Sequence, residues 1–386
     1  MITRIFTSVA LAAMCVSCSP KYVAPTSDAE TPADTDAKVE FALDFFKKAN
    51  QTVKSDENLI VSPYSAAVAL SMLEEGAQGQ TKAEFDDVLN GCLYPAEDLG
   101  GNKKIQVKSA NSMWISDNFS VRNRYVSLLE KDYDTFVTTQ NFSDPATVKA
   151  INNWCSENTA GKITEIIDEL SPNDVLVLIN ALYFNAPWAE AFDKTFTSDA
   201  TFHAVSGDKS VKMMSNADRY AYAEYQGAQI IRLPYQGDRY SMTVILPPSE
   251  QTVDAMLQFV KGSTFEAAMS MLSEREVTIR MPKFRLESSL VLDKTLQKMG
   301  LNTAYSPAAD FGAISESGPL SLGTVKQKCY IDVTEEGTEA AAVTSAQIRL
   351  TSVSRPTIMT VNRPFLFFIS DSQTNNILFM GKVVNL

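Results

Sequence analysis

Few side chains in this sequence could do acid–base, nucleophilic or metal chemistry together. The chain has one histidine, His203, in a context typical of an edge strand, and beyond its first 20 residues three cysteines at wide spacings, Cys92, Cys155 and Cys329. A hydrolase needs a base beside its nucleophile, and neither a G-x-S-x-G motif nor a glycine-rich phosphate loop is present. We therefore expect a protein that is not an enzyme and has no cofactor and no metal site.

The most unusual stretch is residues 335–356, "EEGTEAAAVTSAQIRLTSVSRP", which comes shortly before the apolar segment "NRPFLFFIS". Every second residue from Thr338 to Leu350 is small or apolar, and the residues between them are mostly polar or small. A period of two is the pattern of a strand with one face turned inward. Because the first inward residues are too small to anchor a core, the segment could enter between strands that are already in place.

Gly337 supplies a hinge for such a movement, because glycine adopts backbone dihedrals that other residues avoid. The preceding run, "VKQKCYIDV", is itself strand-like, so the chain leaves a strand at "EEG" and could later continue it. Insertion of Thr338–Leu350 at roughly 3.3 Å per residue would carry its far end about 43 Å along a sheet. The alternative is a disordered Ala/Thr-rich loop without a role.

The rest of the chain must supply the sheet that receives this segment. Helical spacing and capping signals predict helices at residues 37–51, 63–76, 145–161, 252–272 and 290–300, with a further short helix after residue 76. Strands are predicted at residues 59–61, 175–188, 276–284, 364–371 and 376–386, and several more between 201 and 247. Helices dominate the first part and antiparallel strands the second, which predicts an α+β fold in one large domain.

The N-terminus has the features of an export signal. Residues 1–17 contain one charge, Arg4, then an apolar run too short to span a bilayer, and Ser17 directly before Cys18. This pattern predicts a lipoprotein signal with Cys18 as the acylated residue; plain secretion with an incidental cysteine is the alternative. Residues 18–37 read as a flexible linker and 38–386 as the folded domain. We expect a lipid-anchored protein of the cell envelope, on the periplasmic or the outer side.

The chain is acidic, with a formal net charge of −12 over 386 residues. Removal of the signal takes away Arg4 and changes this charge to −13. A nucleic-acid partner is therefore not expected, and contact with a membrane is expected only through the N-terminal lipid.

Seven stretches, in order along the chain, resemble the serpin family. They are "NLIVSPYSAAVALSMLEEGAQGQTKAEF", "LINALYFNAPWAEAFD", "VKMM", "PKFRLESSLVLDKTLQKMGL", "FGAIS", "EEGTEAAAVT" and "NRPFLFFISDSQTNNILFMGKVVN". The resemblance implies three β-sheets surrounded by about nine helices, and an exposed mobile reactive-centre loop. It also implies a monomer that inhibits a serine or cysteine protease through a covalent complex, with the loop inserting as a strand.

The resemblance assigns a hinge and a scissile bond to the loop. The hinge comprises Glu336, Gly337, Thr338, Glu339, Ala340, Ala341 and Ala342, and the reactive centre lies among Leu350, Thr351, Ser352 and Val353. Thr351 before the cut bond would suit an elastase-like protease and Leu350 a chymotrypsin-like or papain-like one. Arg349 would suit a trypsin-like protease, but the inserted segment would then be short by two residues.

Further positions correspond to the sheet that must open. Ser62, Ser65 and Asn180 match a buried polar cluster under its centre, although a helix cap and satisfied core polar groups would look the same. Gln327 stands where the family often has a histidine, so pH-gated opening through that position is not expected. Trp188 matches the tryptophan where the loop first enters, or else is an ordinary core aromatic.

A non-inhibitory serpin that acts as a binding or structural surface protein is the main rival. Such relatives commonly carry large, charged or proline residues in the hinge, whereas the inward positions of "GTEAAAVT" are small. The hinge composition therefore favours an inhibitor.

Overall fold

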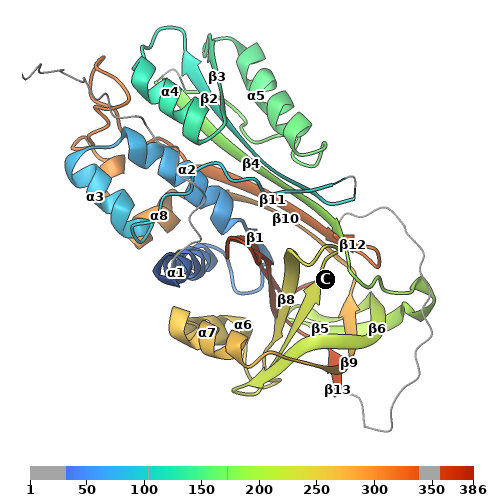
Figure 1. The fold of residues 1–386 in the computed structure, drawn as a ribbon. Helices are drawn as coiled ribbons and strands as arrows, with labels where there is room; N and C mark the ends of the chain where they lie inside the picture. Colours follow the sequence, from blue (N-terminus) through green and yellow to red (C-terminus); the bar gives the residue numbers. More distant parts are fainter. Residues whose placement is uncertain (1–31, 103, 172, 339–356) are drawn as a thin grey trace, which may run out of the picture.

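The computed structural model describes residues 32–102, 104–171, 173–338 and 357–386 (Figure 1). Within these ranges it contains eight α-helices and two short 3₁₀ helices. The α-helices are α1 (Pro32–Asn50), α2 (Pro63–Gly76), α3 (Gly79–Val88), α4 (Asn123–Asp132), α5 (Pro145–Asn158), α6 (Val253–Phe259), α7 (Gly262–Ser270) and α8 (Asp293–Met299). The 3₁₀ helices are η1 (Lys194–Phe196) and η2 (Thr303–Tyr305).

The strands form two hydrogen-bonded sheets. The six-stranded sheet has the order β10 (Phe284–Val291), β11 (Lys326–Val333), β12 (Gly337–Thr338), β4 (Leu176–Pro187), β2 (Gln106–Ser116) and β3 (Thr135–Gln140). The nine-stranded sheet has the order β1 (Leu59–Val61), β15 (Ile377–Val383), β14 (Phe365–Asp371), β8 (Tyr240–Leu246), β7 (Ala228–Pro234), β6 (Gly207–Tyr225), β9 (Ser273–Pro282) and β13 (Thr357–Thr360), with β5 (Ser198–Ala204) paired to β6.

The expected third sheet is merged into the nine-stranded one, and the long strand β6 is the reason. Residues 207–213 of β6 pair with β5, residues 213–222 pair with β9, and residues 221–225 pair with β7. One continuous strand thus carries three ladders, and it joins strands that would otherwise form two separate sheets. The α+β class is confirmed, while the expected three sheets are corrected to two in the described residues.

The six-stranded sheet has an unusual centre. β12 is antiparallel to both of its neighbours, with Thr338 opposite Val333 of β11 and opposite Ala186 of β4. β4 and β11 therefore run parallel to each other, and Figure 1 shows β12 at one end of them. In the described part of the chain, the two residues of β12 make the only ladder between β4 and β11.

Helices cover the faces of both sheets. α5 packs on the six-stranded sheet, where Ile151 lies in one apolar cluster with Trp114 of β2 and Ile179 of β4 (Figure 1). α7 packs on the nine-stranded sheet, where the Phe265 ring lies 5.1 Å from the Phe368 ring of β14. Each sheet thus has a helix packed on one of its faces.

Capping residues set the ends of two helices as their sequences predict. Ser62 caps α2 by accepting a hydrogen bond from the Ser65 amide, and Asp144 caps α5 by accepting one from the Ala146 amide. Pro63 and Pro145 occupy the first helical positions, where the missing amide hydrogen is not needed.

The helix predicted at residues 252–272 is divided into α6 and α7, and the predicted starts of two other helices are wrong. The helix predicted at residues 290–300 starts only at Asp293, because residues 284–291 alternate in the strand β10, which pairs with β11 along its whole length. The first helix starts at Pro32 and not at Ala37.

Candidate functional site

Two residues of the predicted hinge, Gly337 and Thr338, lie in the six-stranded sheet. Thr338 is 1% exposed, between β11 and β4. Gly337 has φ = +150°, and a Cβ atom added there would lie 2.3 Å from the carbonyl oxygen of Ala186. No Cβ atom comes that close to a backbone oxygen, so this position requires glycine in the conformation observed.

Two acidic residues before the glycine fasten the chain as it leaves β11. The Glu335 carboxylate is 2.7 Å from Nζ of Lys283 and accepts a 2.9 Å hydrogen bond from the Thr197 hydroxyl. Glu336 forms an ion pair with Lys194 of η1. Their carbonyl oxygens accept hydrogen bonds of 2.9 Å from the amides of Phe192 and Trp188, so side chains and backbone both hold this turn.

The same contacts shift the acidity of both carboxyl groups. Burial raises the pKa of Glu335, but hydrogen bonds from Lys283 and Thr197 outweigh burial, and its pKa lies below the ordinary value. For Glu336, burial likewise raises the pKa, and the hydrogen bond from Lys194 brings it below the ordinary value. When folding lowers the pKa of a carboxyl group, that group stabilises the folded state at any pH above its pKa in the unfolded chain. This stabilisation is lost as the pH falls through the pKa of the group in the folded protein.

We therefore expect the stabilisation from Glu335 to be complete above about pH 4.5 and to disappear as the pH falls further. Thermal unfolding of the wild type and of Glu335→Gln at pH 7, 5, 4 and 3 measures it. The wild type should unfold at the higher temperature at pH 7, and the difference should vanish at the lowest pH. A difference that stays constant over this range would show that the charge of Glu335 does not matter.

Trp188 lies against the hinge. Its indole nitrogen donates a 3.0 Å hydrogen bond to the carbonyl of Thr334, and its ring stacks on Tyr235 with centroids 4.5 Å apart and planes within 9°. The side chain is buried, at 2% exposure. Trp188 thus lies beside the predicted hinge residues, and its role at the entry of the loop stays a prediction.

Three of the four residues predicted for the buried polar cluster meet under the sheet. The Gln327 side-chain amide bonds twice to the backbone of Ser62: Oε1 accepts from the amide at 3.0 Å and Nε2 donates to the carbonyl at 2.8 Å. The Ser62 hydroxyl accepts a 3.1 Å hydrogen bond from the Ser65 amide. Gln327 thus fixes the start of α2 to β11 with a group that does not titrate.

Asn180, the fourth, has different partners. Its Nδ2 donates to the Ser109 hydroxyl at 2.9 Å and to Oδ1 of Asn111 at 2.7 Å, both on β2. Asn111 in turn donates to the carbonyl of Tyr133 at 2.6 Å. Within the described residues, the buried Oδ1 of Asn180 accepts no hydrogen bond. The structure therefore ties Asn180 to the neighbouring strand and not to Ser62.

The two buried thiols and the histidine lie on different elements of the fold. Burial raises the pKa of the Cys155 and Cys329 thiols to about 12, so neither provides a thiolate at neutral pH. His203 is exposed on β5, with Nδ1 2.8 Å from the Asp208 carboxylate. In the part of the chain that is described, no helix is long and apolar enough to cross a membrane.

Several predicted positions lie outside the described residues. They are the hinge residues Glu339, Ala340, Ala341 and Ala342, the reactive-centre residues Leu350, Thr351, Ser352 and Val353, and Cys18. Conversely, sequence reasoning missed Lys283, Thr197, Lys194 and Tyr235, which hold the hinge. Only the fold brings them to the loop, and no local sequence signal distinguishes them.

Comparison with known proteins gives a consistent result. The family model described as "Serpin (serine protease inhibitor)" matches residues 36–386. An uncharacterized serpin-like protein of Methanosarcina acetivorans is 34% identical over 93% of this chain and 90% of its own length. Intracellular coagulation inhibitor 2 of Tachypleus tridentatus is 33% identical over 86% of each chain. Among solved structures, the thermophilic serpin tengpin in its native state has a TM-score of 0.86 at 29% identity, covering 94% of this chain and 96% of its own.

The chain belongs to the serpin family. Members of this family are in general protease inhibitors and not enzymes.

Proposed function

We propose that this serpin inhibits its target protease as a suicide substrate. The protease cleaves the loop within Leu350–Val353 and becomes acylated by the residue before the cut bond. Insertion of Thr338–Leu350 as a new strand between β4 and β11 then carries the protease away before water completes hydrolysis. The observation that carries this proposal is β12, whose two residues already lie between β4 and β11.

The register of β12 defines the path that the inserted segment would follow. In an antiparallel pair, each step forward along the loop is one step back along its neighbour. Since Thr338 faces Ala186, continuation of the same register would bring Ile348 opposite Leu176, the first residue of β4. Residues 338–348 of the alternating segment could therefore pair along β4, and the last two residues would extend past its first residue.

The same register matches the small side chains of the segment to the large ones of β4. Residues opposite each other in an antiparallel pair share a face, so the inward set would lie beside the core-facing residues of β4. The expected pairs are Ala340 with Phe184, Ala342 with Leu182, and Thr344 with Asn180. Thr344 would bring a hydroxyl group opposite the asparagine whose Oδ1 lacks a partner among the described residues.

Hydrogen bonding favours this insertion. The edges of β4 and β11 that face each other lack ladder partners beyond β12 in the described residues, and an inserted strand would supply them. Each backbone hydrogen bond contributes roughly 0.5–1.5 kcal/mol net. Over a dozen or so residues these contributions add up, and small inward side chains avoid the steric penalty that would oppose them.

The residues near the scissile bond suggest the class of target. A small residue such as Thr351 before the cut bond fits an elastase-like protease, and Leu350 fits a chymotrypsin-like or papain-like one. Cleavage after Arg349 would place a trypsin-like protease on a segment two residues too short.

We also infer an N-terminal lipid on Cys18. The variant Cys18→Ala should therefore move from the membrane fraction to the soluble fraction.

A carrier function is the second candidate, because one structurally similar protein, human thyroxine-binding globulin, was solved with thyroxine bound. Its TM-score is 0.81 at 26% identity, and the match covers 91% of this chain and 98% of that protein. In this chain, an apolar cavity between α6–α7 and strands β7–β8 measures about 80 Å³ and is lined by Ile230, Ile245 and Phe265, among others. Sites for small organic ligands usually occupy about 300–1,000 Å³. In this structure the cavity is therefore smaller than such a ligand requires.

Heat resistance after cleavage distinguishes the two functions. If the loop is cut by a protease that does not form a complex, the inserted strand should complete the six-stranded sheet and raise the temperature of thermal unfolding markedly. A non-inhibitory protein would show the same unfolding temperature before and after the cut.

A further inference from the structure

Two buried hydroxyl groups from distant parts of the chain meet at the hinge. The Tyr235 hydroxyl is 2.7 Å from Oγ1 of Thr338, and either group can donate the hydrogen bond. Tyr235 is fully buried and Thr338 is 1% exposed. Tyr235 lies in the turn between β7 and β8 of the nine-stranded sheet, so this contact joins the two sheets at the first residue of the inserting segment.

The ring of Tyr235 has little freedom to turn away. One face stacks on Trp188, and its edge packs against Phe184 with centroids 5.0 Å apart. The backbone is held as well, because the Tyr235 amide donates to the Tyr240 carbonyl at 3.0 Å and the Gln236 amide donates to the Pro187 carbonyl at 2.9 Å. The hydroxyl is therefore presented to the hinge by a fixed ring.

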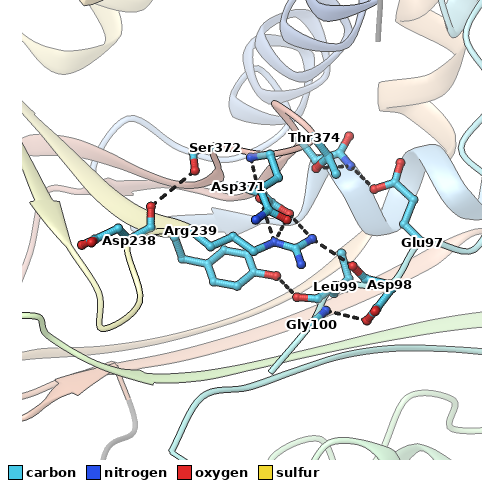
Figure 2. A network of polar contacts seen from close by, with 12 residues as sticks. Glu97, Asp98, Leu99, Gly100, Asp238, Arg239, Asp371, Ser372 and Thr374 are labelled. Atoms are coloured by element: carbon cyan, nitrogen blue, oxygen red, sulfur yellow. Dashed lines mark hydrogen bonds and ion pairs between the residues drawn. The ribbon is translucent and has the colours of Figure 1, made fainter. Parts of the chain in front are cut away.

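The far side of the same turn is anchored by a polar network (Figure 2). The guanidinium of Arg239 binds the fully buried carboxylate of Asp371 through Nε at 3.0 Å and Nη2 at 2.7 Å. The Ser372 amide donates to the Arg239 carbonyl at 2.8 Å, and the Tyr240 hydroxyl donates to the Leu99 carbonyl. Charge-assisted, two-pronged bonds of this kind restrict both position and orientation.

We propose that Tyr235 is a positioning residue that receives Thr338, selects a hydroxyl group at this first inserted position, and holds the hinge in the sheet before any protease arrives. The proposal builds on the suicide-substrate function and adds a residue that prepares the insertion.

The energetic reason is the penalty for a buried, unpaired hydroxyl. Among the described residues, the hydrogen bond to Thr338 is the only one made by the Tyr235 side chain. If the hinge withdraws, or if residue 338 is apolar, the phenol loses this partner in a dry site. Loss of one partner is costly, whereas replacement of both by apolar groups of similar shape is nearly neutral. Burial also raises the pKa of Tyr235, so the phenol stays protonated and the contact does not depend on pH near neutrality.

Hydrogen exchange of the uncleaved protein tests the proposal without a protease. The amides of residues 334–338 are followed by mass spectrometry in the wild type, Tyr235→Phe, Thr338→Val and the double variant. Each single variant should exchange about 5- to 100-fold faster at these amides, and the double variant should return to within about threefold of the wild type. Thr338→Ser, which keeps the hydroxyl, should remain protected.

Tyr240→Phe is the matched control. It removes another buried tyrosine hydroxyl from the same turn, but that hydroxyl bonds to the Leu99 carbonyl and not to Thr338. Exchange at residues 334–338 should not change in this variant. Should Tyr235→Phe fail to fold, the comparison of Thr338→Ser with Thr338→Val still decides whether the hydroxyl is recognised.

The number of inhibitor molecules consumed per inactivated protease is the second readout. It should rise in both single variants and recover in the double variant, which a loss of general stability would not produce. Equal exchange in all variants, or losses that simply add in the double variant, would overturn the proposal. If the exchange cycle behaves as expected but the wild type traps no protease, the role of Tyr235 stands and the proposed inhibition fails.

Discussion

Thr338→Arg should convert the protein from an inhibitor into a substrate. The side chain at this position is buried against the Tyr235 hydroxyl, and the nearby carboxylates of Glu335 and Glu336 are already paired with Lys283 and Lys194. An uncompensated buried charge costs several kcal/mol, which exceeds the 1.4 kcal/mol that changes a ratio of rates tenfold. Hydrolysis of the acyl-enzyme should therefore be faster than insertion of the loop into the sheet.

The measurement is the fraction of cleaved protein that appears as covalent complex on a denaturing gel. We expect this fraction to fall about tenfold or more for Thr338→Arg and to be retained by Thr338→Ser. The cleaved Thr338→Arg protein should also lack the gain in heat resistance. Normal complex formation by the arginine variant would rule out insertion that starts at residue 338.

Glu335→Lys should destabilise the native fold and release the hinge. It replaces the anion that binds Lys283 and Thr197 with a second cation at the same place. Breaking a buried ion pair costs ~3–5 kcal/mol, and we expect about 2–3 kcal/mol here, because Lys283 is partly exposed to solvent. The thermal transition, scanned at a fixed rate, should fall by several degrees, with faster hydrogen exchange at residues 334–338.

Glu335→Gln is the control for size and shape. It keeps an acceptor for the Thr197 hydroxyl but loses the charge, so its transition should lie between those of the wild type and Glu335→Lys. If both variants unfold at the wild-type temperature, the ion pair with Lys283 does not fasten the hinge.

Local rules made part of this architecture predictable. The pairs Ser62–Pro63 and Asp144–Pro145 set two helix starts through capping and fixed φ angles. The alternation that begins at Thr338 predicted a strand, and its first residue does lie in β12. The strand β10 shows the same alternation, so a helix predicted to start at residue 290 was an avoidable error.

The partners of the hinge were not predictable, because they depend on the packing of the two sheets. Tyr235 is 103 positions from Thr338 along the chain, and nothing in its local sequence points to a loop so distant. For Asn180, the strand itself was predicted. Its hydrogen bonds to Ser109 and Asn111 were not, because they depend on how β4 is aligned with β2. Sequence periodicity specifies the faces of strands, whereas the contacts of a site require the neighbours as well.

The central claim is that a protease cuts this loop and is then trapped by its insertion. The most direct test incubates the protein with elastase-like, chymotrypsin-like, papain-like and trypsin-like proteases, and analyses covalent complexes on denaturing gels and released peptides by mass spectrometry. We predict a stable complex with at least one of the first three, and a released peptide that begins at Thr351, Ser352 or Val353. Cleavage without any complex, or a stable complex formed by cleavage after Arg349, would contradict it.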